Sequence, residues 1–241
     1  MLSKRILFFI FILFFFACKK EGENTESPFY DFPNDKLWRH RVNCIEIANN
    51  YAQKFPGIEI DLYYVDSIDG FICDHGEVCA GIPLRDLLLT IENRNEIYYW
   101  FDFKNSNTNS VVDASVSDLE NILIEFDIKE KSIVESQNPY CIQKYRENDF
   151  YTSYWIPHIS EDTKEERERI TKIIQGVIDV QKPTVLSASY KMFSFLKKNF
   201  PNEILHFWTN GLITEGDKRT INKIKNYNNA KVILVDYSEP F

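Results

Sequence analysis

Eight short stretches rich in apolar, β-branched and aromatic residues recur along the chain, and each has the length and pattern of a strand. Stretches with a helical pattern lie between them. The predicted strands span residues 37–42, 57–65, 96–104, 132–136, 150–157, 183–189, 203–209 and 230–237. The predicted helices span residues 46–54, 83–93, 117–126, 138–147, 164–180, 190–199 and 217–227. Such alternation predicts a parallel sheet covered by helices.

The number and order of these elements predict an α/β fold, a compact TIM-type (β/α)8 barrel. A doubly wound open sheet is the main alternative, and the lack of a glycine-rich phosphate loop after the first strand weakens it. Ser117 and Glu120 have the spacing of a capping box, which predicts that a helix begins at Ser117. Residues 71–75 follow an Asp69-Gly70 turn, so we expect them to extend the second strand or fold back beside it.

The N-terminal segment differs in composition from the rest of the chain. Lys4 and Arg5 precede an apolar run over residues 6–16, which is too short to span a bilayer but suits the core of a signal peptide. Ala17 directly before Cys18 resembles the lipobox of bacterial lipoproteins. The pattern therefore predicts cleavage before Cys18 and lipidation of its thiol.

The chain is thus predicted to have three parts. Residues 1–17 form a lipoprotein signal peptide, residues 18–35 a flexible tether, and residues 36–241 the barrel domain. The polar, proline-containing composition of the tether is typical of a linker between a membrane and a folded domain. We expect an exported lipoprotein, bound to a membrane of the bacterial cell envelope through its lipid anchor. An ordinary signal peptide with another cleavage site, or a short buried helix, is the alternative.

Composition and charge limit the classes of binding partner. Hydrophobic residues make up 44% of the 241 residues, which is enough to form one sizeable buried core. The formal net charge is −8, and it becomes −10 if Lys4 and Arg5 are removed, because residues 1–17 contain no acids. A surface of this sign repels nucleic acid, and no basic stripe with interleaved aromatic residues is present. A nucleic-acid partner is therefore not expected.

Export would place the remaining cysteines outside the reducing cytosol. Cys44, Cys73, Cys79 and Cys141 could then form one or two disulfides, with three possible full pairings. Their spacing does not fit a structural zinc site. Cys73 and Cys79 lie on either side of His75, where a disulfide would rigidify the loop, and free buried thiols are the alternative.

Three acids fall on neighbouring predicted strands. Glu59 and Asp61 are two residues apart and share one face of the second strand, and Asp102 lies towards the end of the third. In a barrel these strands are adjacent, and their C-terminal ends carry the functional groups. Three carboxylates there would form an all-oxygen pocket, which suits Mg²⁺ or Ca²⁺. The alternative is that the acids form structural ion pairs with Arg41 and Lys104, although burying three acids for structure alone costs much desolvation free energy.

Two of the four histidines, His40 and His75, lie beside these acids in the predicted fold. Breaking a phosphodiester requires neutralising the charge on its oxygens, activating a nucleophile and protonating the leaving alkoxide. A metal, a base and an acid supply these three needs. The constellation therefore indicates a metal-assisted phosphodiesterase.

The order of the motifs resembles the glycerophosphodiester phosphodiesterases. HR lies on strand one and ExD on strand two, and a DG turn, a DH pair and DFK on strand three follow. The WxHxVN pattern at residues 38–43 is similar to the motif that opens the domain in the menorin-like relatives of these enzymes. FWTN at residues 207–210 and VILVDYSEP at residues 232–240 resemble the family's strand-seven tryptophan segment and its final strand. The resemblance is dense over residues 38–104 and thin between the other motifs.

The resemblance implies a role for eight residues of the barrel. It implies general acid and base catalysis by two histidines, His40 and His75. It implies that the cation, Mg²⁺ or Ca²⁺, is held by three acids, Glu59, Asp61 and Asp102. It implies that the substrate is bound by Arg41, Lys104 and Trp208. In the family a substrate hydroxyl next to the phosphate attacks first, and water then opens the cyclic phosphate, so the implied products are glycerol 3-phosphate and an alcohol.

Two further functions stay open. The segment that supplies one acid of the family's usual pocket has no counterpart here, which favours a catalytically inactive barrel acting as a surface binding module. The second further function is that of a phospholipase D-like relative, which cleaves lipid head groups. A glycerophosphodiester phosphodiesterase or such a phospholipase would act on a small phosphodiester or a phospholipid head group. The absence of a GxSxG motif argues against a serine hydrolase.

Overall fold

Eight parallel strands close into a barrel in the computed structural model, which describes residues 32–68, 70–76, 81–159, 163–211 and 214–237. Closure is shown by β1, which pairs in parallel with both β2 and β10. Around the barrel the strands are β1 (Leu37–Arg39), β2 (Gly57–Val65), β5 (Tyr98–Phe103), β6 (Ser132–Ser136), β7 (Tyr151–Trp155), β8 (Val185–Ser189), β9 (Leu205–Trp208) and β10 (Ala230–Val235). The predicted TIM-type barrel is confirmed, and the open sheet is excluded.

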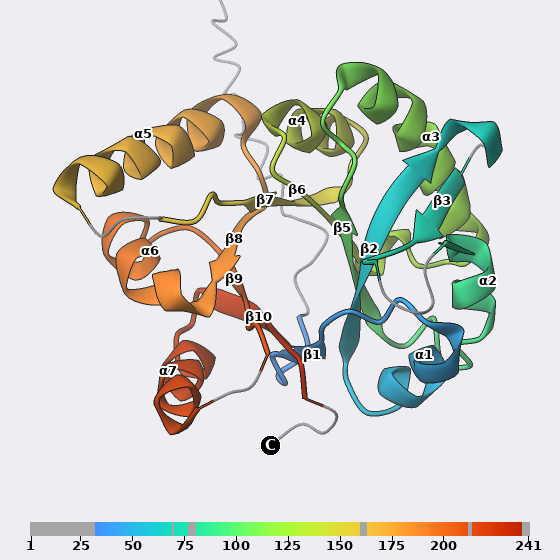
Figure 1. Cartoon of the computed structure of the whole chain (residues 1–241), viewed down its shortest axis with the longest axis horizontal. Coiled ribbons are helices and arrows are strands. Elements are labelled where there is room, and N and C mark those ends of the chain that lie inside the picture. The colour runs from blue at the N-terminus through green and yellow to red at the C-terminus, as the bar shows by residue number, and fades with distance from the viewer. Residues whose placement is uncertain (1–31, 69, 77–80, 160–162, 212–213, 238–241) are drawn as a thin grey trace, which may run out of the picture.

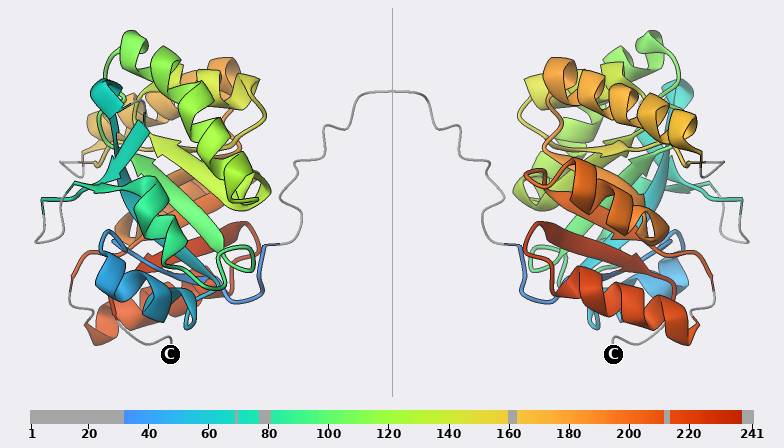
Figure 2. Two further views of the ribbon diagram at one scale, coloured as in Figure 1. Left: turned by 90° about the vertical axis from the view of Figure 1, so that its right-hand side faces the viewer. Right: turned by 90° about the vertical axis from the view of Figure 1, so that its left-hand side faces the viewer.

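Helices surround the barrel in the described part of the chain (Figure 1). They are α1 (Ile45–Ala52), α2 (Leu84–Leu89), α3 (Asn109–Glu125), α4 (Pro139–Glu147), α5 (Lys164–Gln181), α6 (Phe193–Asn199) and α7 (Glu215–Lys225), with short 3-10 turns η1 (Asp66–Ile68), η2 (Lys129–Lys131) and η3 (Tyr190–Met192). Figure 2 shows α1 to α3 on one side of the barrel and α5 to α7 on the opposite side. None of the described helices is long and apolar enough to cross a membrane.

A short antiparallel extension follows β2. Strand β3 (Gly70–Cys73) pairs antiparallel with β2, and β4 (Ile82–Pro83) pairs antiparallel with β3. The predicted return of residues 71–75 beside the second strand is therefore confirmed. Because Pro83 belongs to β4, helix α2 begins one residue later than predicted, at Leu84, and it ends earlier, at Leu89.

Helix α3 begins eight residues before the predicted start at Ser117, so the capping-box interpretation is wrong. The helix begins at Asn109, and its N-cap is Thr108, whose side chain accepts a hydrogen bond from the backbone N–H of Val111. Ser117 lies inside the helix. The helix extends this far because buried apolar residues at helical spacing begin before Ser117. Val112 and Val116 continue the buried face that Leu119 and Leu123 form after it.

Large side chains fill the interior of the barrel. Trp38, Trp100 and Tyr151 are each almost fully buried inside the barrel. The Trp38 indole lies across the start of β2, and a Cβ atom at Gly57 would come within 2.4 Å of it. Glycine is therefore required there for close approach of the ring. Because these side chains fill the barrel interior, a site is expected at the C-terminal ends of the strands.

His206 belongs to this packed interior, as expected for a histidine within a strand. Its ring is fully buried, and its centroid lies 5.0 Å from that of Trp100. Burial lowers the pKa of His206 to about 3, and the charge of Lys231 adds to the effect. The imidazole is thus neutral and structural. His158, in contrast, is exposed in the connection after β7.

The predicted signal peptide (residues 1–17), most of the tether (residues 18–35), Cys18 and Cys79 lie outside the described residues. Cys44 is disulfide-bonded. Cys73 and Cys141 are free and buried, so the suggested Cys73–Cys79 disulfide is wrong and the alternative of a free buried thiol holds for Cys73.

Candidate active site

A pocket of about 120 Å³ opens at the C-terminal end of the barrel strands. All eight residues to which the sequence assigned a role in the barrel line it: His40, Arg41, Glu59, Asp61, His75, Asp102, Lys104 and Trp208. Four residues to which the sequence assigned no role line it as well: Glu135, Trp155, Asn210 and Leu234. The fold thus brings together groups from opposite ends of the chain at the end of a barrel where this fold carries its active sites.

Three buried acids form the centre of the pocket. Glu59, Asp61 and Asp102 each place one carboxylate oxygen within 4.8 Å of the others. Asp61 and Asp102 lie opposite each other on neighbouring strands, because β2 and β5 pair in register at these residues. Exposure of the three residues is only 1%, 1% and 7%, respectively. Carboxylates held so close and so far from water repel one another, and either protonation or a nearby cation relieves this repulsion.

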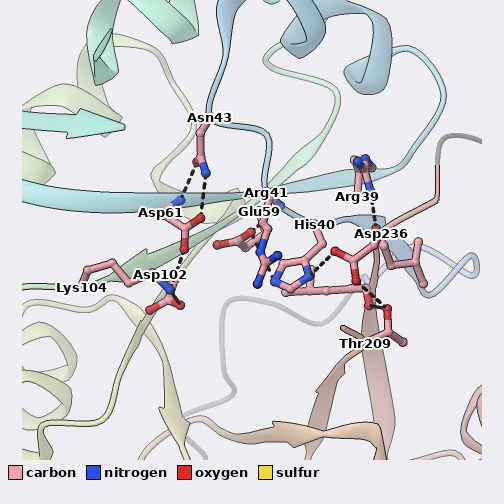
Figure 3. A network of polar contacts seen from close by, with 12 residues as sticks. Arg39, His40, Arg41, Asn43, Glu59, Asp61, Asp102, Lys104, Thr209 and Asp236 are labelled. Carbon is pink, nitrogen blue, oxygen red and sulfur yellow. Dashed lines mark hydrogen bonds and ion pairs between the residues drawn. The ribbon is translucent and has the colours of Figure 1, made fainter. Parts of the chain in front are cut away.

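The segment after β1 positions two of these acids (Figure 3). Asn43 Nδ2 donates to Asp61 Oδ2 at 2.7 Å, and the backbone N–H of Asp61 donates to Asn43 Oδ1 at 2.9 Å. The backbone N–H of Arg41 donates to Glu59 Oε2 at 2.6 Å. Arg41 makes this bond from a left-handed backbone conformation, with φ of 59°. Such a conformation is uncommon for a residue with a side chain and is often found at functional sites.

Lys104 already provides one cation to the cluster. Its Nζ lies 2.6 Å from Asp61 Oδ1 and also pairs with Asp102 Oδ2. The ion pairs suggested as a structural alternative therefore exist for Lys104. These ion pairs do not include Glu59, whose Oε1 is buried and has no hydrogen-bond partner among the described residues. One ammonium group thus satisfies two of the three acids, and the third retains an unused ligand atom.

Two of the acids, Glu59 and Asp102, have raised pKa values. Burial is the main cause for both Glu59 and Asp102, and the charge of Asp61 raises both further. The charge of Lys104 opposes these effects without cancelling them. For Lys104, burial acts to lower the pKa, but the charges of Asp102 and Asp61 outweigh it and raise the pKa. A bound divalent cation would favour the ionised carboxylates, which are also the forms that bind metal.

His40 is held in a fixed orientation by an acid from the last strand segment. Its Nδ1 lies 2.9 Å from Asp236 Oδ1, and its Nε2 lies 3.8 Å from Glu59 Oε2. Asp236 in turn accepts hydrogen bonds from Thr209 Oγ1 and the backbone N–H of Gly211. Burial acts to raise the pKa of Asp236, but the hydrogen bond and charge of His40 lower it overall. The carboxylate orients the ring so that Nε2 is the nitrogen on the side of the acids.

The remaining predicted residues lie around the mouth of the pocket. His75 is exposed in the turn after β3. Trp208 ends β9, and its ring meets the ring of Trp155 edge to face at a centroid distance of 6.0 Å. Arg41 Nε is buried and has no hydrogen-bond partner among the described residues. A buried guanidinium nitrogen of this kind suits an anionic ligand oxygen.

Glu135 is a fourth buried acid, and it lies opposite Asp102 on the neighbouring strand β6. Its Oε1 accepts hydrogen bonds from Ser153 and Ser187. Burial and the charge of Asp102 raise the pKa of Glu135 to about 8, against the lowering effect of the Ser187 hydrogen bond. The group is therefore largely protonated at neutral pH.

Glutamine at position 135 is expected to remove a pH dependence of stability. Because the folded pKa of Glu135 lies above the unfolded value, the folded chain binds more protons between about pH 4.5 and pH 8, so wild-type stability falls as pH rises through this window. In EDTA, the free energy of unfolding of Glu135→Gln should gain on wild type by up to about 1.4 kcal/mol per pH unit there. Chemical denaturation at pH 5 and pH 8 measures this. Glu96→Gln, an exposed control, should show no such gain, and equal profiles for Glu135→Gln and wild type would contradict the raised pKa.

Methionine at position 104 is expected to make stability depend on divalent cations. Lys104→Met leaves Asp61 and Asp102 buried without their cation, which should lower the free energy of unfolding in EDTA by about 3–5 kcal/mol. Millimolar Mg²⁺ or Ca²⁺ should recover most of this loss, because ligands of the folded state stabilise it. Thermal unfolding with and without the cation measures both effects. A loss that the cation leaves unchanged would contradict the cation-binding assignment, and Lys172→Met, at an exposed position, is the control.

Comparison with solved structures finds the same barrel in glycerophosphodiester phosphodiesterases. The one from Parabacteroides distasonis is 13% identical, with 86% of this chain and 94% of that chain covered and a TM-score of 0.60. The one from Agrobacterium tumefaciens is 10% identical, with 85% and 97% covered and a TM-score of 0.57. A glycerol uptake operon antiterminator-related protein from Thermotoga maritima also aligns, at 11% identity, 85% and 96% coverage and a TM-score of 0.51. No protein-family model and no curated protein matches the sequence.

The chain therefore has the closed α/β barrel fold seen in these solved glycerophosphodiester phosphodiesterases. At such low identities the fold is what the comparisons establish. The antiterminator-related neighbour shows that this barrel also occurs in proteins described by other functions.

Proposed function

We propose that the protein is a divalent-metal-dependent phosphodiesterase, which hydrolyses glycerophosphodiesters to glycerol 3-phosphate and an alcohol. The observation that carries the proposal is the convergence of Glu59, Asp61 and Asp102 beside an imidazole that a carboxylate holds in place. The barrel shared with solved glycerophosphodiester phosphodiesterases supports the same reaction class.

The pocket residues fit a divalent cation. Three carboxylates offer the oxygen ligands that Mg²⁺ and Ca²⁺ prefer, and Glu59 Oε1 is a buried ligand atom without a partner among the described residues. Glu59, Asp61 and Asp102 would hold the ion. When bound, it would supply Lewis-acid stabilisation of charge on the phosphate oxygens. The acids alone do not distinguish between the two metals.

The side chains around the acids can perform the other steps. His40 Nε2 faces the acid cluster and can move a proton to or from the reacting group, because Asp236 fixes the ring through Nδ1. His75, which lines the same pocket from the turn after β3, is the proposed partner in acid and base catalysis. Arg41 and Lys104 would bind phosphate oxygens, and Trp208 would form one wall for the substrate.

We also propose that the protein is an exported lipoprotein anchored at Cys18. The segment that carries this prediction lies outside the described residues, so its support is the sequence pattern and the disulfide at Cys44. Disulfides form and persist in oxidising compartments and are rare in the cytosol. A membrane location would bring the pocket close to the phospholipid head groups from which such diesters derive.

A binding module without catalytic activity is the second candidate, and Lys104 is the observation that favours it. The ammonium group pairs with Asp61 and Asp102, so a positive charge can neutralise much of the cluster without a metal. The release of glycerol 3-phosphate from a glycerophosphodiester, with Mg²⁺ or Ca²⁺ and then with EDTA, separates the two. Cation-dependent release supports the enzyme. Binding of the diester without release at any cation concentration supports the binding module.

A further inference from the structure

A second and larger cavity adjoins the acid pocket on the side of Lys104. Its volume is about 350 Å³, compared with about 120 Å³ for the acid pocket. The two share three lining residues, Asp102, Lys104 and Trp155. Cavities of the larger size commonly hold small molecules, whereas the smaller one has room for a phosphate group and little else. A phosphodiester bound at the acids would therefore place one of its alcohols in the larger cavity.

Neutral amide groups dominate the part of the second cavity that the acid pocket does not share. Asn107, Asn109 and Gln137 line it, are exposed, and have no side-chain hydrogen bond to another described residue. Each amide offers two N–H donors and a carbonyl acceptor. We call this cavity, defined by Asn107, Asn109 and Gln137 together with its Trp155 wall, the amide subsite.

Two other polar residues hold the subsite in shape. Asn138 accepts from the backbone N–H of Tyr140 and donates from Nδ2 to the carbonyl of Ser106. The Ser106 hydroxyl in turn bonds Ser136 at 2.7 Å. These contacts tie the segment after β5 to the segment after β6. Asn107 and Gln137 are thereby presented by two connected loops at the same end of the barrel, and Asn109 is the first residue of α3.

The chemistry of the lining distinguishes among the alcohols that phosphodiesters carry. A quaternary ammonium group is recognised by several aromatic faces or by unpaired carboxylates, but this cavity has one indole, Trp155, and its only acid, Asp102, is paired with Lys104. An acyl chain requires an apolar wall, and Phe103 is buried. Hydroxyl groups both donate and accept, which matches free amides, and the C–H face of a polyol ring can pack on an indole.

We propose that the amide subsite binds an uncharged polyhydroxy alcohol, such as a cyclitol or a sugar, esterified to the phosphate held beside Lys104. The inference rests on the proposed function for the position of the phosphate, and it adds the class of substrate. The substrate is then a glycerophosphodiester of a polyol rather than of choline or ethanolamine. Hydrogen bonds from Asn107, Asn109 and Gln137 give the selectivity.

Glycerophosphoinositol and glycerophosphocholine are the probes for this inference. With the wild-type protein and Mg²⁺ or Ca²⁺, kcat/KM for the inositol diester should exceed that for the choline diester by at least about tenfold. The double substitution Asn107→Ala and Gln137→Ala should lower the inositol value by about tenfold or more, since each lost hydrogen bond is expected to cost about fivefold. It should leave the choline value within about twofold. Asn228→Ala, at an exposed position just before β10 and so at the opposite end of the barrel, is the matched control.

A binding measurement keeps this test separate from the test of hydrolysis. Calorimetric titration of both diesters into the same proteins in EDTA should give a Kd about tenfold lower for the inositol diester, and the double substitution should remove the difference. Hydrolysis of both diesters at equal kcat/KM would overturn the subsite and leave the phosphodiesterase proposal standing. Absence of all hydrolysis would overturn the phosphodiesterase, and the subsite would then stand or fall on the Kd values, with equal values or no binding overturning it.

Discussion

Replacing Asp61 with asparagine is expected to reduce kcat/KM for a glycerophosphodiester by about a thousandfold or more. The substitution removes one negative ligand from the cluster with Glu59 and Asp102 but keeps the size of the side chain. A bound cation contributes several kcal/mol of stabilisation to the charged transition state, and a loss of about 4 kcal/mol corresponds to a thousandfold in rate. Steady-state kinetics over a range of Mg²⁺ and Ca²⁺ concentrations measures the effect.

Two comparisons show whether this loss comes from the cation. Asp179→Asn makes the same chemical change at an exposed position of α5 and should retain full activity. Wild type in EDTA should lose activity to the same level as the Asp61→Asn protein, and excess cation should restore wild type far more than the variant. A variant with wild-type kcat/KM, or wild-type activity that persists in EDTA, would contradict the assignment of the acids.

Replacing His40 with glutamine is expected to reduce kcat by about 10²–10⁴-fold, the usual contribution of general acid and base catalysis. Glutamine can keep a hydrogen bond to Asp236, but it cannot transfer a proton at the pH of the assay. Because the acids are untouched, cation affinity should change far less than kcat. Single-turnover kinetics at saturating cation and substrate measures the chemical step directly.

The exposed histidine after β7 provides the control for this prediction. His158→Gln should leave kcat within about twofold of wild type. Asp236→Asn should fall between His158→Gln and His40→Gln, because it disturbs the orientation of the His40 ring without removing it. If His40→Gln kept wild-type kcat, proton transfer at this position would be disproved, whatever the result at Asp61.

Much of the fold could be predicted from the sequence because the barrel strands are short, apolar and regularly spaced. Strand β2 occupies residues 57–65, as predicted, since nearly the whole strand is buried and rich in β-branched and aromatic residues. The start of α3 could not be found in the same way. A serine followed by a glutamate three residues later also occurs inside helices, and only the burial of Val112 and Val116 shows that the helix extends back to Asn109.

The acids and histidines could be found from the sequence because they lie on or near the ends of the first predicted strands. Glu59 and Asp61 share β2, Asp102 lies on the neighbouring β5, and His40 directly follows β1. Asp236 lies within the motif at residues 232–240, but its pairing with His40 could not be predicted, because His40 lies near the opposite end of the chain and only barrel closure brings them together.

Glu135 and Asn107 are visible as site residues only when the structure is known. Glu135 stands alone among apolar residues and serines, and its relation to Asp102 depends on the register between β5 and β6. Asn107 lies in a polar connection that resembles any surface loop, and its importance comes from the cavity that it lines. Sequence patterns can indicate which residues a strand carries, but register and closure decide which of them meet.

Calorimetric titration of Mg²⁺ and of Ca²⁺ into the metal-free protein tests the central claim most directly. If Glu59, Asp61 and Asp102 form a cation site, at least one of the two ions will bind with one ion per chain, and the Asp61→Asn protein will lose that binding while the Asp179→Asn protein keeps it. If neither ion binds the wild-type protein, or if both variants bind as wild type does, the three acids are not a metal site.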